Sequence, residues 1–158
     1  MLKEFSDDFA KYKKIGQQTM AQVSDDALNH VPGADLNSIA IIVRHLNGNL
    51  ISRFTDFLTT DGEKNWRDRD TEFSEVRYSR KEVEEFWAKG WEALESALAE
   101  LRDEDLQKTV SIKGNLMTAD AALCRALAHI AYHVGQMVLL GRVTSEGQWQ
   151  YLSTRRKR

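Results

Sequence analysis

The sequence predicts an all-α protein, a four-helix bundle, from its few helix breakers, four long segments with helical apolar spacing and almost no strand pattern. Its 158 residues include one proline and nine glycines, and it is rich in Ala, Leu, Glu and Lys, which favour helix. A chain of this length is expected to form one domain that buries about 68–70% of its unfolded surface. We assign residues 1–152 to that domain and the basic residues 153–158 to a solvated C-terminal tail.

The first two helices are expected in the N-terminal part of the chain. One covers about residues 2–23, and the second runs from the capping residues at 35–38 to the Asp61-Gly62 turn. The apolar side of the first is formed by Leu2, Phe5, Phe9, Tyr12, Ile15 and Met20, and the second ends with Phe54, Phe57 and Leu58. Both spacings turn one apolar face toward a common core.

The connection over residues 60–78 is much longer than the about 2–8 residues usual between bundle helices. Such a crossover can carry the chain back along the bundle, so the second and third helices are expected to run in the same direction, in an up-down-down-up topology. The third helix is expected to begin with a capping box at Ser79 and Glu82 and to end near Leu101. Its Trp87 and Trp91 are expected in the core or at a dimer contact.

A small hairpin and the last helix complete the chain. Residues 108–116 contain Val110, Ile112 and Gly114-Asn115, a pattern that favours a hairpin. The last helix is expected from Thr118 to Gly141, with Asp120 in its first turn.

Composition and charge exclude several classes of function. The net charge of −2 has both signs mixed along the chain, so no basic face indicates a nucleic-acid partner. We read no apolar run near the ~18 residues of a membrane span and no signal-peptide core, and therefore expect a cytoplasmic protein without a membrane partner. The lone Cys124 cannot form an internal disulfide and is expected to be a small buried hydrophobe.

Two histidines on the last helix indicate a metal site. His129 and His133 stand four residues apart in an apolar helical run, so both lie on one face and can hold one ion from one side. A third ligand has to come from His30 or His45. His45 is in the middle of another apolar helix, whereas His30 lies beside Pro32-Gly33 in a turn, so we expect His45.

The alternative is that these histidines are core residues or a surface switch, since a helical histidine on an apolar face often has no ligand role. Three buried, unpaired imidazoles would be a costly way to fill a core, and this favours the metal.

The order of these features resembles the DinB-like superfamily of four-helix bundles, which includes YfiT-like proteins. The resemblance rests on Val43-Arg44-His45-Leu46 and on His129-Ile130-Ala131-Tyr132-His133 followed by Gly135-Gln136. Residues 49–64, followed by Arg67-Asp68-Arg69-Asp70, resemble a functionally uncharacterised branch.

The resemblance implies a divalent metal, commonly zinc or nickel, held by His45, His129 and His133 with water, and a homodimer. Relatives perform S-transfer with bacillithiol or mycothiol, maleylpyruvate isomerisation and metal-dependent hydrolysis. The resemblance carries none of these reactions to particular residues of this chain.

Four further residues are substrate-binding candidates. Asn49 and Arg53 follow His45 at four-residue steps, although a buried hydrogen bond for Asn49 and a salt bridge of Arg53 to the crossover, for example to Asp70, are alternatives. Trp66 can cover a pocket mouth or order the crossover, and Gln136 can orient a metal ligand. Tyr132 points away from the histidines by about 100° and is expected to pack.

The leading hypothesis is a metal-dependent enzyme acting on a small molecule, with a thiol S-transferase or a hydrolase as its form and a low-molecular-weight thiol as a possible cosubstrate. The alternative is a non-catalytic dimer stabilised by its metal. A helical scaffold without metal is the third reading. An open fourth coordination position beside a pocket favours the enzyme.

Overall fold

The structure, a computed structural model, describes residues 1–147 and 149–152 and is mostly helical, as the sequence predicts. Its long helices are α1 (Leu2–Met20), α3 (Ile39–Phe54), α5 (Arg80–Glu100) and α6 (Ala119–Thr144). Between them lie α2 (Asp25–Asn29), α4 (Arg69–Glu72), the 3-10 helix η1 (Asp103–Gln107) and strands β1 (Thr109–Ile112) and β2 (Asn115–Thr118). The proposed tail over residues 153–158 lies outside the described residues.

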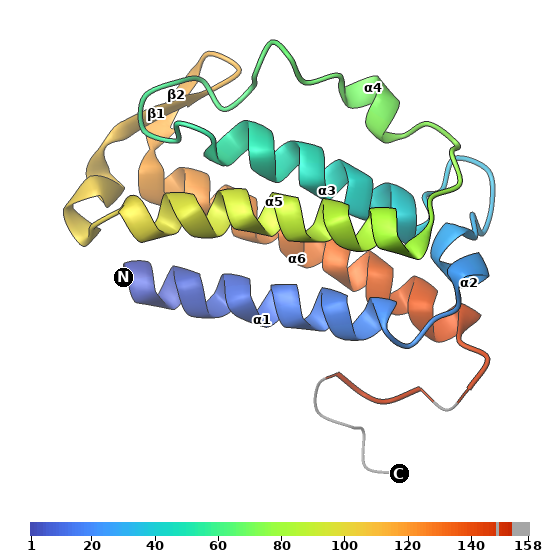
Figure 1. The fold of residues 1–158 in the computed structure, drawn as a ribbon. Helices are drawn as coiled ribbons and strands as arrows, with labels where there is room; N and C mark the ends of the chain where they lie inside the picture. The colour runs from blue at the N-terminus through green and yellow to red at the C-terminus, as the bar shows by residue number, and fades with distance from the viewer. Residues whose placement is uncertain (148, 153–158) are drawn as a thin grey trace.

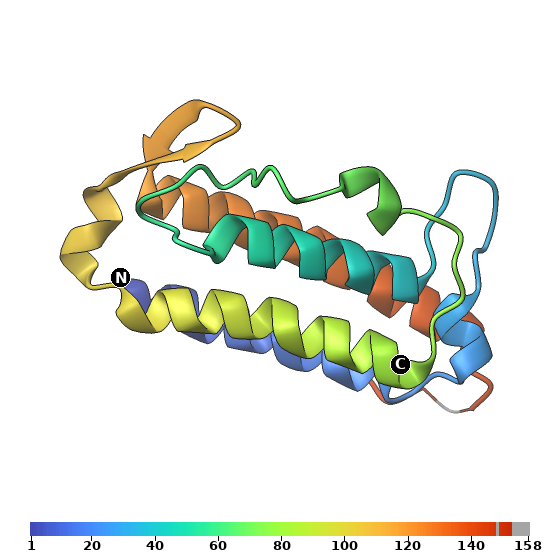
Figure 2. The ribbon, with the colours of Figure 1, turned by 45° about the horizontal axis from the view of Figure 1, so that its top comes forward.

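The long helices pack side by side, α3 mainly on α5 and α1 mainly on α6 (Figure 1). Figure 1 also shows that α3 and α5 run in one direction and that α1 and α6 run in the other. The segment between α3 and α5 carries α4 back along α3, and both views show it lying over that helix (Figures 1 and 2). The crossover thus brings polar loop residues over the middle of the bundle.

Local sequence signals explain the helix starts. Ser79 accepts a hydrogen bond from the backbone N–H of Glu82, and Glu82 accepts one from the backbone N–H of Ser79, which is the predicted capping box. Ser38 caps α3 by accepting from the N–H of Ile41. The side chain of Asp68 caps the short α4 in the same way, an element that the apolar pattern does not predict.

The predicted hairpin is present as β1 and β2, in antiparallel register from Thr109 opposite Thr118 to Ile112 opposite Asn115. Its turn residues are Lys113 and Gly114, both with positive φ. Asp61 accepts hydrogen bonds from the backbone N–H groups of Lys113 and Gly114, each at 2.8 Å, so the crossover holds the hairpin turn.

Two predicted helix ends are wrong. The helix of His45 ends at Phe54, because Thr55 is extended and Asp56 has φ 51°; Phe57 and Leu58 therefore follow the helix rather than belonging to it. The last helix passes Gly141 and ends at Thr144. Gly141 does not cap the helix but allows close packing, since a Cβ there would lie 3.0 Å from Cγ2 of Thr19.

The core explains where the tryptophans and the cysteine lie. Trp87 and Trp91 are buried within the bundle, and Gly16 leaves the space that the Trp87 ring fills. Cys124 was expected inside but is exposed. Its neighbour Leu123 occupies the core position. Successive side chains of a helix point about 100° apart, so Cys124 is directed toward solvent.

Helix α6 contradicts the expectation that no apolar run of the chain is long enough to span a membrane. It has 26 residues and a window of mean hydropathy 1.2, so by length and composition it is apolar enough to cross a membrane. The core helix of a bundle meets the same criterion, because it buries residues such as Leu123, Ile130 and Met137.

Candidate metal centre

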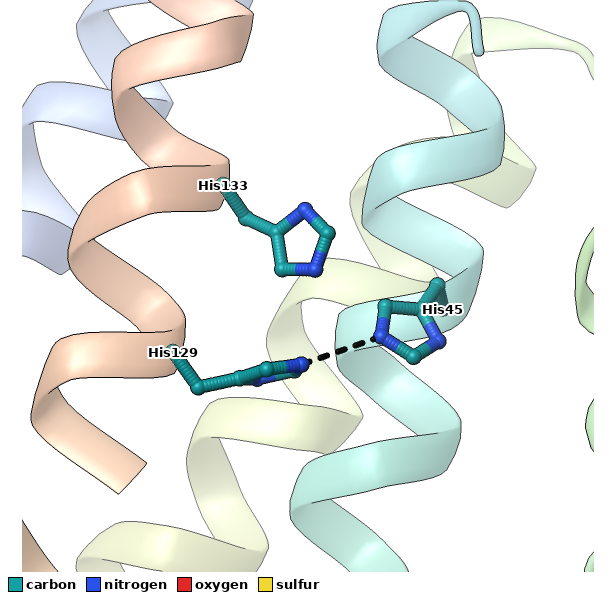
Figure 3. Close-up of side chains that lie close together, drawn as sticks. All are labelled: His45, His129 and His133. Atoms are coloured by element: carbon teal, nitrogen blue, oxygen red, sulfur yellow. Dashed lines mark hydrogen bonds between the residues drawn. The ribbon is translucent and has the colours of Figure 1, made fainter. Parts of the chain in front are cut away.

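Three imidazoles from two helices point toward one another in the middle of the bundle (Figure 3). Helix α3 provides His45, and α6 provides His129 and His133 one turn apart. Nε2 of His45 lies 3.2 Å from Nε2 of His129, and one nitrogen from each of the three rings lies within 4.8 Å of the others. Since the donors of a tetrahedral zinc ion lie about 3.4 Å apart, each ring has to move by no more than about 1 Å for the three nitrogens to share one ion.

Glu72 determines which nitrogen of His45 faces its neighbours. Oε2 of Glu72 lies 2.8 Å from Nδ1 of His45, and a carboxylate only accepts, so Nδ1 carries the proton. With that proton on Nδ1, Nε2 is the nitrogen of His45 that faces His129 and that can offer a lone pair to an ion. A cation between the two Nε2 atoms would accept a lone pair from each, and the donor set therefore fits a divalent metal.

Glu72 itself is buried, with 1% of its surface exposed. Arg67 donates to it through Nε at 2.8 Å and Nη2 at 2.9 Å. Burial alone would raise the pKa of Glu72, but the hydrogen bonds and charges of His45 and Arg67 outweigh it and lower the pKa. Glu72 is therefore a carboxylate at neutral pH, and the Arg67–Glu72–His45 chain is fully paired.

Our sequence reasoning missed both residues of this pair. Glu72 ends α4, a helix of four residues inside the long crossover, where apolar periodicity gives no signal. Arg67 is in the charged run noted for its resemblance, but its side chain, 3% exposed, is not on the surface. Only the capping residue Asp68 marks the site of a helical turn there.

His133 is oriented from its own helix. Its Nδ1 lies 2.9 Å from Oε1 of Gln136, so Nδ1 donates and Nε2 remains free to bind an ion. Gln136 thus lies where it can orient a ligand, and it is not among the residues that line the pocket described below. His129 differs, because its buried Nδ1 has no hydrogen-bond partner among the described residues.

Burial makes two of the histidines poor bases. It is the main reason that the pKa of His129 falls to about 3 and that of His133 to about 4, with the neighbouring imidazoles lowering both values further. Both rings are therefore neutral at physiological pH, which is the form that binds metals.

A cavity of about 460 Å³ opens beside His45 and His129. Asn49 and Arg53 line it, as their spacing from His45 suggests. Tyr132 lines it too and is 52% exposed, whereas we expected it to pack away from the site. Trp66 is 60% exposed and is not among the residues that line the pocket.

Arg53 does pair with the crossover, but through a different partner from the one expected. Its Nη1 lies 2.8 Å from Oε2 of Glu63 and also donates to the carbonyl of Gly62. Asp70, the partner suggested by the sequence, is exposed and makes no ion pair with Arg53 in the described part of the chain. The part of the pocket wall formed by the crossover is thus attached to α3.

Comparisons with known proteins identify the family and the fold. Residues 1–158 match the family described as "Protein of unknown function (DUF1572)". A DinB-like protein from Bacillus cereus has a similar structure, with TM-score 0.66, 20% identity and coverage of 92% of this chain and 95% of that one. A conserved protein from Enterococcus faecalis matches with TM-score 0.68, 16% identity and coverage of 91% and 96%. No curated protein matches.

Proposed function

Since the chain belongs to the family of unknown function DUF1572 and has the DinB-like fold, we propose that it is a metal-dependent enzyme acting on a small molecule. One divalent ion is held by His45, His129 and His133. Three imidazole nitrogens suit zinc or nickel, which bind nitrogen ligands well.

The separation of 3.2 Å between Nε2 of His45 and Nε2 of His129, beside an open pocket, carries this proposal. Three protein ligands with one side open are typical of a catalytic zinc, whereas a structural zinc normally has four protein ligands. The pocket therefore favours an enzyme over a dimer that uses its metal only for stability.

The residues of the chain have distinct roles in this proposal. Glu72 keeps the proton of His45 on Nδ1, and Gln136 does the same for His133. Asn49 and Arg53 contact the substrate in the pocket. When bound, the ion supplies a Lewis acid that makes a water or a thiol nucleophilic at neutral pH, which suits hydrolysis or thiol S-transfer.

The proposal also takes the long helices as an up-down-down-up bundle. In that topology the crossover from the end of α3 to the start of α5 has to pass along the bundle, and this path lays Glu72 over His45. The long connection thus positions the carboxylate that orients His45.

Metal analysis of protein purified without an affinity tag tests the proposal. We expect about one zinc or nickel ion per chain in wild-type protein, and loss of that ion in His45→Ala and His133→Ala, because two imidazoles hold an ion much more weakly than three. His30→Ala is the matched control, since His30 is exposed and distant in sequence from the ligands.

Circular dichroism of the same variants separates binding from folding. The helical signal should persist when the metal is lost, because apolar burial supplies most of the stability of a bundle. Metal-loaded protein is then assayed with a panel of thiols plus electrophiles and of hydrolysable esters and amides. Wild-type protein that binds no metal, or His133→Ala that keeps it, would overturn the proposal.

A further inference from the structure

The pocket beside the histidines is strongly cationic, although the chain as a whole has a net charge of −2. Its lining includes five cationic side chains and one carboxylate, that of Glu63. The cations are Arg53, Arg67, Arg69, Lys113 and Arg125. Since they come from α3, the crossover, the hairpin turn and α6, the fold gathers them at one place.

Two of the five cations are already neutralised within the protein. Arg67 donates twice to the carboxylate of Glu72. Arg53 pairs with Glu63. Glu63 also lies 3.6 Å from Nη1 of Arg67, and the charge of Lys113 contributes to lowering the pKa of Glu63, so this one carboxylate faces several cations of the pocket at once.

The other three cations form no ion pair within the described part of the chain. Within residues 1–147 and 149–152, no carboxylate lies at ion-pair distance from the side chains of Arg69, Lys113 or Arg125. Arg69 lies 5.5 Å from the ring centre of Phe73. Lys113 lies in the hairpin turn, and its backbone N–H donates a hydrogen bond to Asp61. These side chains are exposed and free to contact a solute.

The same pocket also has an apolar part. Phe54, Phe57, Ile112, Ala122 and Ala126 contribute to its lining. A ligand that fits both parts carries an apolar body and an anionic group. The volume of about 460 Å³ lies in the range usual for sites that bind small molecules.

We propose that the substrate is a small organic anion, whose carboxylate or phosphate group binds Arg125 and Lys113 while its apolar body lies against Phe54 and Ile112. Arg125 precedes His129 by one helical turn, about 6 Å along the axis, so the far end of such a ligand reaches the open side of the histidines. This inference rests on the proposed function only for the end of the ligand that faces the metal. The cations and the apolar wall of the pocket are present without an ion.

Binding of matched probes by isothermal titration calorimetry tests the inference. The probes are 4-phenylbutyrate, phenyl phosphate and the neutral 4-phenylbutyramide, each titrated into metal-free and zinc-loaded protein. We expect at least one of the two anions to bind metal-free protein about ten-fold more tightly than the amide, because the neutral amide cannot form the charge-assisted contact. The carboxylate and phosphate arms show which anion the pocket prefers.

Charge removal shows whether the pocket cations cause that preference. Arg125→Gln and Lys113→Gln should each weaken anion binding about three-fold and together about ten-fold, with no change for the amide. Arg142→Gln, on the same helix, and Lys89→Gln are matched controls, since both residues are exposed and outside the pocket. Zinc affinity should stay unchanged in all four variants.

The outcomes separate this inference from the proposed function. Protein that binds zinc but binds the amide as tightly as both anions overturns the inference and leaves the metal site intact. The inference is equally overturned if Arg125→Gln and Lys113→Gln bind the anions like wild type. Anion binding that depends on these cations in a protein that binds no zinc supports the pocket and overturns the metal-dependent function.

Discussion

Gly48 and Glu72 share one space, because a Cβ at position 48 would lie 2.7 Å from Cδ of Glu72 and closer still to its Oε1. The absent side chain on α3 is thus what admits the carboxylate that orients His45. Without that glycine, Glu72 could not reach Nδ1 of His45 from the crossover.

Gly48→Ala should therefore weaken metal binding by about ten-fold, since loss of the group that orients a ligand typically costs 10–100-fold in affinity. Competition with a fluorescent zinc chelator measures the effect. Gly135→Ala on α6 is the control, because a Cβ there meets no atom within 4 Å. It should leave zinc affinity unchanged and stabilise the helix by up to about 1 kcal/mol. Equal zinc affinity in both variants would argue against the role of Glu72.

Glu72→Gln removes the charge but keeps the shape. It should lower zinc affinity by about 10–100-fold, because a neutral amide orients His45 less strongly. It should also lower the free energy of unfolding by about 3 kcal/mol, since buried Arg67 loses its nearest counter-charge and keeps only the carboxylate of Glu63, 3.6 Å away. Urea unfolding and zinc titration measure the two effects. Glu75→Gln, exposed on the same crossover, should change neither.

The stability of the metal-free protein should fall in mild acid. His129 and His133 have pKa values of about 3 and 4 in the folded state, against 6.5 for an ordinary histidine. Between these values the unfolded chain binds protons that the folded chain does not, so the free energy of unfolding decreases as the pH falls from 6.5 toward 4. We expect a lower Tm at pH 5 than at pH 7.5 in the presence of a chelator.

His129→Gln should show a smaller drop in Tm between those two pH values, because one of the two depressed pKa values is gone. His30→Gln is the matched control and should show the wild-type drop, since His30 is exposed. A wild-type Tm that is the same at pH 5 and pH 7.5 would contradict the neutral, buried state of the two rings.

Asp61 joins the crossover to the hairpin through one carboxylate. Hydrogen bonds from Ser111, from the backbone N–H groups of Gly114 and Glu63, and from Lys113 hold its pKa well below the usual range. Asp61→Ala should lower the free energy of unfolding by about 1 kcal/mol and loosen the wall that carries Lys113. Urea unfolding and hydrogen exchange of the hairpin amides test this. Asp70→Ala, an exposed residue of the same crossover, should leave both unchanged.

A homodimer stays a prediction, but its interface cannot be formed by the two tryptophans of α5. Trp87 and Trp91 are inside the bundle, whereas Leu139 and Val143 on α6 are 63% and 72% exposed. We expect wild-type protein to sediment as a dimer at micromolar concentration and Leu139→Glu to shift it toward the monomer. A monomer near 18.1 kDa in wild-type protein would end this prediction without affecting the metal site.

The helix positions and the shared face of His129 and His133 follow from local rules. Four-residue spacing places His129 and His133 on one face, and the Ser79–Glu82 box marks the start of α5 in sequence and structure alike. Glu72 and the end of α3 do not follow from such rules. They depend on how the crossover folds over Gly48 and on the left-handed backbone of Asp56, which are tertiary effects without a periodic signal.

The three imidazoles belong to α3 and α6, whereas Glu63, Arg67, Arg69 and Lys113 belong to the crossover and the hairpin. In the proposed function the ion is therefore held by the helices alone, whereas the pocket that receives the substrate is lined by the same helices together with these loops. An exchange of pocket-lining residues in the loops, with Glu72 retained, would alter which molecule is accepted while the histidine scaffold remains the same. The loop part of the pocket wall can thus be varied without changing a metal ligand, whereas Arg53 and Arg125 lie on the helices that carry the histidines.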